Sequence, residues 1–221
     1  TSWAGVVFLV SATAMLLALT RWAGKAAPLA SAQGLSWPRD PHAKAYWWYA
    51  ALVLACLVYG GALTTALVAE GVTDPLPYIP VLNPVDLSTM LALAALALWR
   101  QMLATANPRP KGAGRLLGGG GLAAGAVLAF AIANTIWLRT AHHFLGIGWH
   151  SDELAGNQIV QSGYSILWTL IAMGLMLFAR RRAKRLPWLA GAVLLAIVVA
   201  KLLFVDMSRS ESLARIVAFI A

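Results

Sequence analysis

The feature that most restricts the fold is a series of apolar blocks, each about as long as a bilayer is thick. About 20 apolar residues in a helix cross the ~30 Å hydrocarbon core. The sequence is 60% hydrophobic and 11% charged, whereas soluble domains are roughly 45–50% apolar and about 25% charged, which excludes a soluble fold. We therefore predict an all-α, polytopic transmembrane helical bundle with six full spans. The blocks cover approximately residues 3–20, 46–69, 85–103, 116–138, 159–179 and 186–205.

The two ends of the chain indicate a fragment of a longer protein. The chain starts at Thr1 without a methionine, and residues 213–221 form an amphipathic stretch typical of the start of a seventh helix. We predict a single transmembrane domain over residues 1–221, continued by further chain. The first block is unlike a signal peptide, because its positive charges, Arg21 and Lys25, follow the apolar run instead of preceding it.

The distribution of charge predicts the orientation in the membrane. Residues 21–45, 100–115 and 180–185 contain most of the 17 Lys and Arg residues. Basic linkers stay in the cytoplasm, so we predict a cytoplasmic linker at 21–45 and a first residue outside. The net charge of +9 is then explained by these basic linkers, which set the orientation, and we expect no nucleic-acid binding. The segments predicted to face outward are residues 70–84, 139–158 and 206–212.

Ionisable residues gather in and beside these outward segments. Residues 139–150, RTAHHFLGIGWH, contain an arginine, three of the four histidines and a tryptophan. His142 and His143 are candidate catalytic residues because imidazole titrates near neutral pH, and Asp206 is a third candidate. The candidates for substrate binding are Asn83, Asp86, Arg139, Trp149, His150, Gln161, Trp168, Lys201 and Arg215.

The paired histidines have alternative interpretations. Adjacent residues on a helix point ~100° apart, so His142 and His143 could ligate one metal only if the helix broke between them. A site made of one of them, His150 and a carboxylate is conceivable, but the sequence has no HExxH or cysteine-rich spacing. We predict no metal and no cofactor. The alternative to a chemical role is that both imidazoles bond backbone or lipid phosphate.

The fifth block carries a polar stripe within an arc of ~100° on one helix face. Such a face looks into the bundle or into a wet cavity. Two interpretations stay open, namely hydrogen bonds between helices and the lining of a site. Lys201 also has two, since it could extend to the headgroups or pair with an acid on another helix, such as Asp86. The stripe consists of Gln158, Gln161, Ser162, Ser165 and Thr169.

Six segments of the sequence serve as motifs, namely DPLPYIPVLNPVDL, ALALWR, RTAHHFLGIGW, IVQSGYSILWTLIAMGLMLFARRR, LPWLAGAVLLAIVVAKLLFVDMS and SLARIVAFI. In this order they resemble a known family, the DUF2339 predicted bacterial membrane proteins of undefined function. The resemblance is to the C-terminal part of that family and covers most of residues 72–221, whereas residues 1–45 match weakly. It implies a bacterial inner-membrane location and a longer protein with more helices, and it implies no catalytic residues.

Three functional hypotheses follow. In the leading one, an outward polar pocket binds or processes an envelope lipid or glycan intermediate. A histidine would act as base, Arg139 or Arg215 would hold a phosphate or carboxylate, and Trp149 would offer an aromatic face. The alternatives are a transporter or proton-coupled carrier, which needs polar groups through the mid-membrane region, and a structural or assembly subunit of a membrane complex. Expected partners are membrane lipid, a lipid-linked or glycan substrate, and the remainder of a longer chain or other membrane subunits. The sequence does not decide whether the protein is an enzyme.

Overall fold

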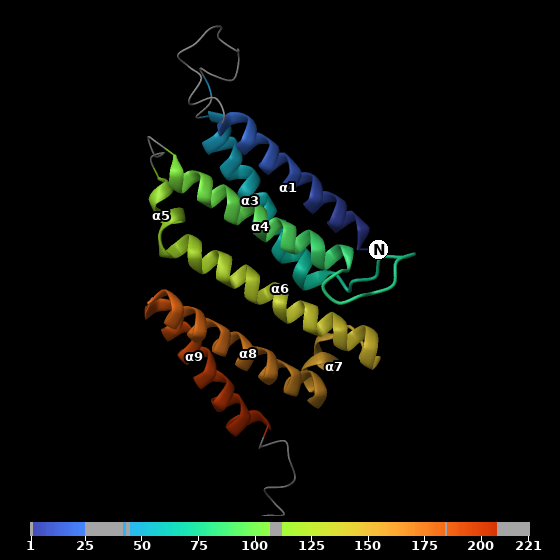
Figure 1. Ribbon diagram of the computed structural model, residues 1–221. Helices are drawn as coiled ribbons and strands as arrows, with labels where there is room; N and C mark the ends of the chain where they lie inside the picture. Colours follow the sequence, from blue (N-terminus) through green and yellow to red (C-terminus); the bar gives the residue numbers. More distant parts are fainter. Residues whose placement is uncertain (1, 25–41, 43–44, 107–111, 184, 207–221) are drawn as a thin grey trace, which may run out of the picture. The chain divides into compact units, whose positions relative to one another are not determined.

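The computed structural model describes residues 2–24, 42, 45–106, 112–183 and 185–206. Six helices in these residues are long and apolar enough to cross a membrane, which confirms the prediction of an all-α bundle with six spans (Figure 1). The predicted start of a seventh helix, residues 213–221, lies outside the described residues. The spans are Trp3–Arg21, Trp48–Val68, Pro84–Thr105, Gly119–Leu145, Gln158–Arg182 and Arg185–Phe204.

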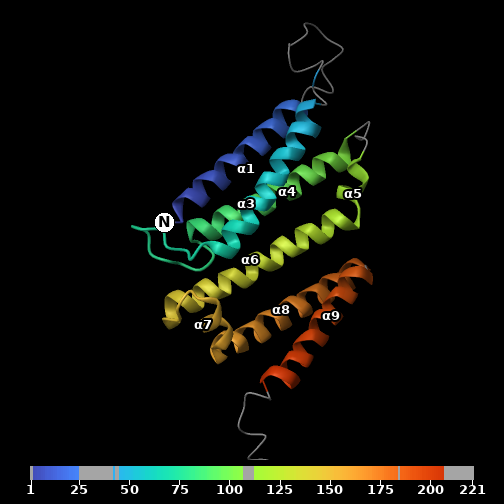
Figure 2. The same cartoon turned by 180° about the vertical axis from the view of Figure 1, so that it is seen from behind.

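The chain divides into two compact units, Thr1–Leu145 and Gly146–Ala221, and each is described by itself. Unit 1 contains α1 (Trp3–Gly24), a π-helical turn (Ala45–Ala50), α3 (Ala51–Val68), α4 (Pro84–Thr105), α5 (Ala113–Leu117) and α6 (Gly119–Leu145). Unit 2 contains α7 (Ser151–Gly156), α8 (Gln158–Arg182), α9 (Arg185–Lys201) and a π-helical turn (Leu202–Asp206) (Figure 2). The single transmembrane domain and the orientation stay predictions.

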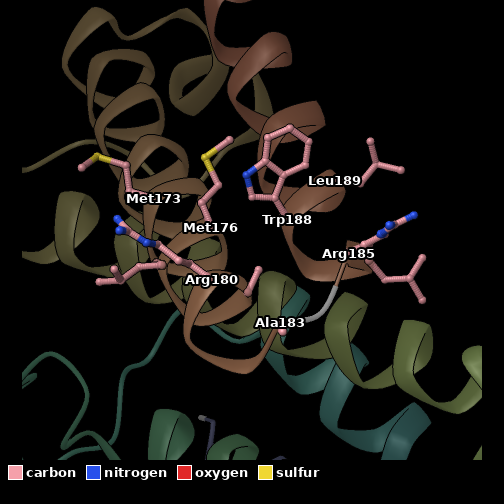
Figure 3. Close-up of a pocket in the computed structure, with 11 residues that line it drawn as sticks. Met173, Met176, Arg180, Ala183, Arg185, Trp188 and Leu189 are labelled. Carbon is pink, nitrogen blue, oxygen red and sulfur yellow. The ribbon is translucent and has the colours of Figure 1, made fainter.

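In unit 2, α8 and α9 form a hairpin around a tight turn at Ala183 (Figure 3). Ala183 has a φ of 49°, and its N–H reaches back to the carbonyl of Ala179, which ends α8. Pro187 lies in the first turn of α9, where a missing N–H costs no helical hydrogen bond. The turn therefore ends one span and begins the next within a few residues.

Gly191 is expected to tolerate no larger side chain, because α8 and α9 meet there. A Cβ at this position would lie 2.8 Å from the carbonyl oxygen of Ala172 and 2.9 Å from Cγ of Met176. Gly191→Ala should lower the free energy of unfolding by about 1–3 kcal/mol through overpacking, measured by SDS titration in mixed micelles. Gly174→Ala is the control, since a Cβ there meets nothing within 4 Å and alanine favours a helix. An equal loss in the control would contradict the prediction.

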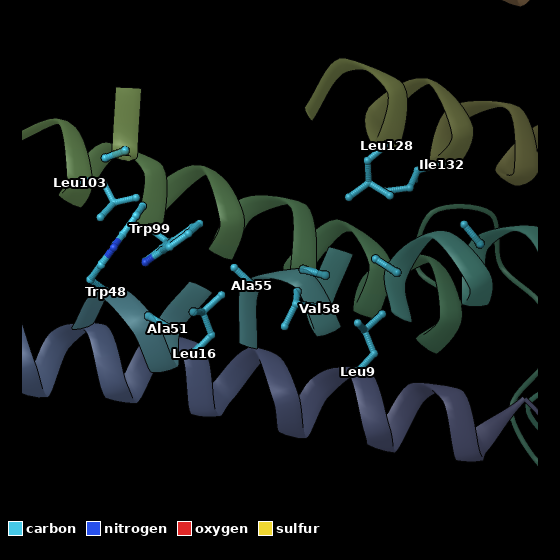
Figure 4. Close-up of a cluster of buried hydrophobic side chains, with 14 residues drawn as sticks. Leu9, Leu16, Trp48, Ala51, Ala55, Val58, Trp99, Leu103, Leu128 and Ile132 are labelled. Carbon is cyan, nitrogen blue, oxygen red and sulfur yellow. The ribbon is translucent and has the colours of Figure 1, made fainter. Parts of the chain in front are cut away.

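The core of unit 1 lies between α1, α3 and α4. Small side chains on the buried face of α3 let the neighbouring helices approach closely, as transmembrane helices generally require. Leu9 and Leu16 of α1 and Leu103 of α4 pack in the same cluster (Figure 4). Buried residues recur every third or fourth position of α3, which places them on one face: Ala51, Ala55, Val58, Ala62 and Ala66.

Helix α6 continues to Leu145, past residue 138 where the fourth block was predicted to end. That prediction stopped before Arg139 because a charged residue is costly in hydrocarbon. The structure corrects it, since Arg139 is fully buried and paired with Asp86, and its charge is compensated inside the protein. Arg139, His142 and His143 therefore lie on the last two turns of α6 and not in a loop.

Candidate functional site

The α3–α4 loop, residues 69–83, is the first part of the candidate site. Its backbone includes two residues with positive φ, Gly71 at 90° and Val81 at 70°, and the second is uncommon for a β-branched residue. The indole Nε1 of Trp3 in α1 donates to the carbonyl of Asp74 at 3.0 Å. The loop is thus attached to α1 and adopts a conformation that needs support from its surroundings.

Arg139 of α6 and Asp86 of α4 form an ion pair at the base of this loop. Their Nη1 and Oδ1 atoms are 2.5 Å apart, and both side chains are fully buried. The guanidinium also donates to the carbonyls of Ala66 (2.6 Å), Ala69 (2.9 Å) and Thr65 (3.3 Å). The end of a helix presents carbonyls without helical donors and a partial negative charge. Arg139 therefore caps α3 and ties it to α4 and α6.

Asp86 and Asn83 fix the loop from its other side. Oδ2 of Asp86 accepts the N–H of Val81 at 3.3 Å, the residue with the positive φ. Nδ2 of Asn83 donates to the carbonyl of Gly71 at 2.9 Å and to Oγ1 of Thr73 at 3.2 Å. Both side chains are buried, so their polar atoms are used within the protein.

His143 packs against the same loop. Its ring is stacked on Tyr78 with centroids 4.3 Å apart and planes at 14°, and its Nε2 lies 3.1 Å from the carbonyl oxygen of Glu70. His142 meets His143 edge to face at 4.9 Å between centroids. Burial raises the pKa of Tyr78 to about 12, so the phenol is protonated at neutral pH and acts as a donor. Because a carbonyl oxygen can only accept, the hydrogen bond between His143 and Glu70 requires a proton on Nε2 of His143. This bond orients the imidazole ring.

A polar groove of about 600 Å³ opens beside the α3–α4 loop in unit 1. Neither His142 nor His143 lines it, and its contact with the histidine cluster runs through Glu70, whose carbonyl faces His143. The groove combines hydroxyl groups, which can donate and accept, with one carboxylate. The lining residues are Ser2, Gly5, Thr64, Thr65, Val68, Ala69, Glu70 and Val72.

In unit 2, Lys201 of α9 bonds to the polar stripe of α8. Its Nζ donates to the carbonyl of Gln161 at 2.8 Å and to Oγ of Ser165 at 3.0 Å. At Gln161 and Ser165 the stripe takes part in hydrogen bonds between helices. This is one of the two interpretations that the sequence left open. Asp86, the acid suggested as a partner of Lys201, is paired within unit 1 with Arg139 of α6.

The other candidates of unit 2 lie apart along its chain. Trp149 is half-buried, and His150 is exposed and immediately precedes α7. Trp168 lies on α8 beside Tyr164, with ring centroids 5.8 Å apart. In unit 2 the structure thus brings together Gln161 and Lys201, and Trp149, His150 and Trp168 stay candidates from the sequence.

Two candidates cannot be placed as side chains. Asp206 ends the last π-helical turn, but its side chain is outside the described part of the structure, and Arg215 lies wholly outside it. Among the residues that the structure describes, no group of three or more His, Cys, Asp and Glu side chains could hold a metal ion.

The structure thus brings together Asn83, Asp86, Arg139, His142 and His143 at one end of unit 1. Sequence reasoning missed Tyr78, Gly71 and Glu70, which complete this cluster. The sequence did contain one signal for the ion pair, because Asp86 and Arg139 are opposite charges near the same predicted end of two spans. Charges in that environment are expected to pair with one another.

The fold and this cluster define a multi-pass α-helical membrane protein. The chain belongs to the DUF2339 family, whose sequence model, described as "Predicted membrane protein (DUF2339)", matches residues 1–221. The match covers the whole chain and so extends beyond residues 72–221, where the motifs resemble the family. Comparison with curated proteins and with solved structures gave no match.

Proposed function

We propose that the chain is a structural or assembly subunit of a membrane complex, in which the α3–α4 loop is a fixed surface for a partner. The observation that carries this proposal is the buried pair of Arg139 and Asp86. Arg139 was expected to hold a substrate phosphate or carboxylate, but it is fully enclosed and donates to four acceptors. Its donors are used to join helices, which supports a structural role.

The side chains of the α3–α4 loop support a contact with a partner. Leu76, Ile79 and Leu82 are 49%, 50% and 63% exposed, although the loop backbone is held by α1, α4 and α6. A rigid segment that presents apolar side chains loses little conformational entropy on binding. Exposed apolar patches commonly mark interaction sites. The partner would be the remainder of a longer chain or another membrane subunit.

A second candidate function is binding or processing of an envelope lipid or glycan intermediate, in a bacterial inner membrane with the loop facing outward. The polar groove of about 600 Å³ favours it, because Glu70 and neighbouring hydroxyls could bind sugar or headgroup hydroxyls. The Glu70 carboxylate would then be a general base in the groove, and His143, whose Nε2 bonds to the Glu70 carbonyl, would have Nδ1 free to act as a second one.

The transporter hypothesis receives less support. Asn134 Nδ2 donates to the carbonyl of Phe130 at 2.7 Å, and Thr169 Oγ1 donates to the carbonyl of Ser165 at 2.7 Å. Each of these groups uses a donor within its own helix, as hydroxyl and amide side chains commonly do in a structural span. They supply no argument for a polar path through the membrane.

Two substitutions separate the structural from the chemical hypothesis in the full-length protein. His143→Phe keeps an aromatic ring against Tyr78 but cannot transfer a proton. Leu82→Asp places a charge on the proposed contact surface, where its side chain is exposed. We expect His143→Phe to restore function in a deletion strain with a measured envelope defect. We expect Leu82→Asp to fail and to release the protein from its complex on native electrophoresis.

Both variants must reach wild-type levels in the membrane, measured by immunoblotting. His142→Ala is the companion control, and the structural proposal expects it to restore function as well. Failure of both histidine variants at normal protein level, together with normal behaviour of Leu82→Asp, would reject the structural role in favour of chemistry at the histidines.

A further inference from the structure

A second groove lies in unit 2, at the turn between α8 and α9, far along the chain from the histidine cluster. Its volume is about 1080 Å³, slightly above the roughly 300–1,000 Å³ common for small-molecule sites. Figure 3 shows Met173 and Met176 of α8 and Trp188 and Leu189 of α9 around it. All its lining residues belong to unit 2.

The wall of the groove is apolar and follows the axis of the span. From Met173 to Arg180 it extends along α8 by about 10 Å at the helical rise. Gly174 lines it, and a Cβ built there meets nothing within 4 Å. Methionine side chains adapt to irregular apolar ligands. An acyl chain lying along the helix matches this shape and chemistry.

The end of the groove is strongly basic. Arg180 and Arg185 line it on either side of the Ala183 turn (Figure 3), and Arg181 and Arg182 follow on the same exposed end of α8. No aspartate or glutamate occurs in the sequence between residues 158 and 205, so α8 and α9 supply no negative charge in return. Arginine binds phosphate oxygens with two parallel hydrogen bonds.

α8 ends and α9 begins here, so we expect this basic end at the boundary between hydrocarbon and headgroups. Trp188 is 53% exposed at the mouth of the groove, in the position that interfacial tryptophans take beside headgroups. We propose that this groove binds an anionic diacyl phospholipid, with the phosphate at the basic end lined by Arg180 and Arg185 and an acyl chain along Met173 and Met176. The occupant is a membrane lipid, because an apolar wall ending in paired cations fits both of its parts at once.

Lipid titration of the 221-residue chain in a neutral maltoside detergent tests this proposal, with native mass spectrometry as readout. The probes are palmitoyl-oleoyl phosphatidylglycerol, phosphatidylcholine with the same chains, and soluble glycerol phosphate. The Kd for phosphatidylglycerol should be about tenfold or more below that for phosphatidylcholine, and glycerol phosphate should not compete. Arg180→Gln/Arg185→Gln should weaken phosphatidylglycerol binding by about 30-fold, the loss expected from two basic contacts.

Two controls make the result specific. Arg181→Gln/Arg182→Gln removes the same charge from exposed residues that do not line the groove, and should change the Kd by no more than about threefold because of screening. Gly174→Phe fills the groove and should weaken both lipids alike, at unchanged thermal stability. The proposal is overturned by equal affinity for the two lipids, by equal loss in both arginine pairs, or by unchanged binding in Gly174→Phe.

Discussion

Asp86→Ala should lower the free energy of unfolding by about 3–5 kcal/mol, the usual cost of breaking a buried ion pair from one side. Asp86 is fully buried and supports Arg139 and the N–H of Val81. Without the carboxylate, the guanidinium stays enclosed and charged, because arginine does not deprotonate in proteins. Unfolding by SDS in mixed micelles, followed by tryptophan fluorescence, measures the loss.

The double variant Asp86→Leu/Arg139→Met removes both charges and is the control. It should cost less than Asp86→Ala alone, since an uncharged pair of similar volume leaves no buried charge behind. It should still cost about 1–2 kcal/mol, because the carbonyls of Ala66 and Ala69 lose their donor. A double variant at least as unstable as the single one would show that charge compensation is not what the pair contributes.

The fold was predictable because the composition of a segment indicates whether it can span a membrane. Each apolar block is long enough to cross the hydrocarbon core and is bounded by prolines, glycines or charges, so length and polarity alone define the six helices. The predicted end of α6 was wrong for the same reason, because a prediction from composition ends the span before the charged residue Arg139. Only the position of Asp86 on a neighbouring helix makes the longer helix favourable.

The interior of the candidate site was less predictable, because it depends on contacts across the sequence. Arg139 bonds to carbonyls that lie about 70 residues away in the chain, namely 70 to Ala69 and 73 to Ala66. A backbone carbonyl has no identity in the sequence, so no motif could indicate this partner. The histidines drew attention because they are rare and titrate near neutral pH, whereas Gly71 and Tyr78, which support the same loop, have no such distinguishing chemistry.

Arg139 and the arginines after residue 179 show the same limit of prediction from sequence. Arg139 carries one charge amid apolar sequence, and the structure encloses it. The arginines after residue 179 form a run for which the positive-inside rule predicts a cytoplasmic position. Their additional arrangement, with Arg180 and Arg185 at the end of an apolar groove, appears only when the hairpin turn at Ala183 brings the two helices together. The pattern of charged residues in the sequence thus predicts the membrane topology. The burial of each charged side chain in the structure determines what else it can bind.

Asn83→Asp should lower the free energy of unfolding by about 2–4 kcal/mol, although aspartate is as good an N-cap as asparagine. Oδ1 would still accept the N–H of Val85, which it now does at 2.9 Å. The amide Nδ2, however, donates to the carbonyl of Gly71 at 2.9 Å, and a carboxylate oxygen there would face another acceptor in a buried site. SDS titration of the purified chain measures the change.

Asn157→Asp is the matched control for this substitution. Asn157 caps α8 through the same atom, with Oδ1 accepting the N–H of Ile159 at 2.9 Å, and it is only partly buried. There aspartate keeps the cap and adds a favourable charge at a helix N-terminus, so stability should be unchanged or rise by about 0.3–1 kcal/mol. A similar loss at both positions would mean that the cap and its charge matter. A loss confined to Asn83 would identify the buried Nδ2 donor, with its bonds to Gly71 and Thr73, as what holds the α3–α4 loop, because Asn157 has no such bonds to this loop.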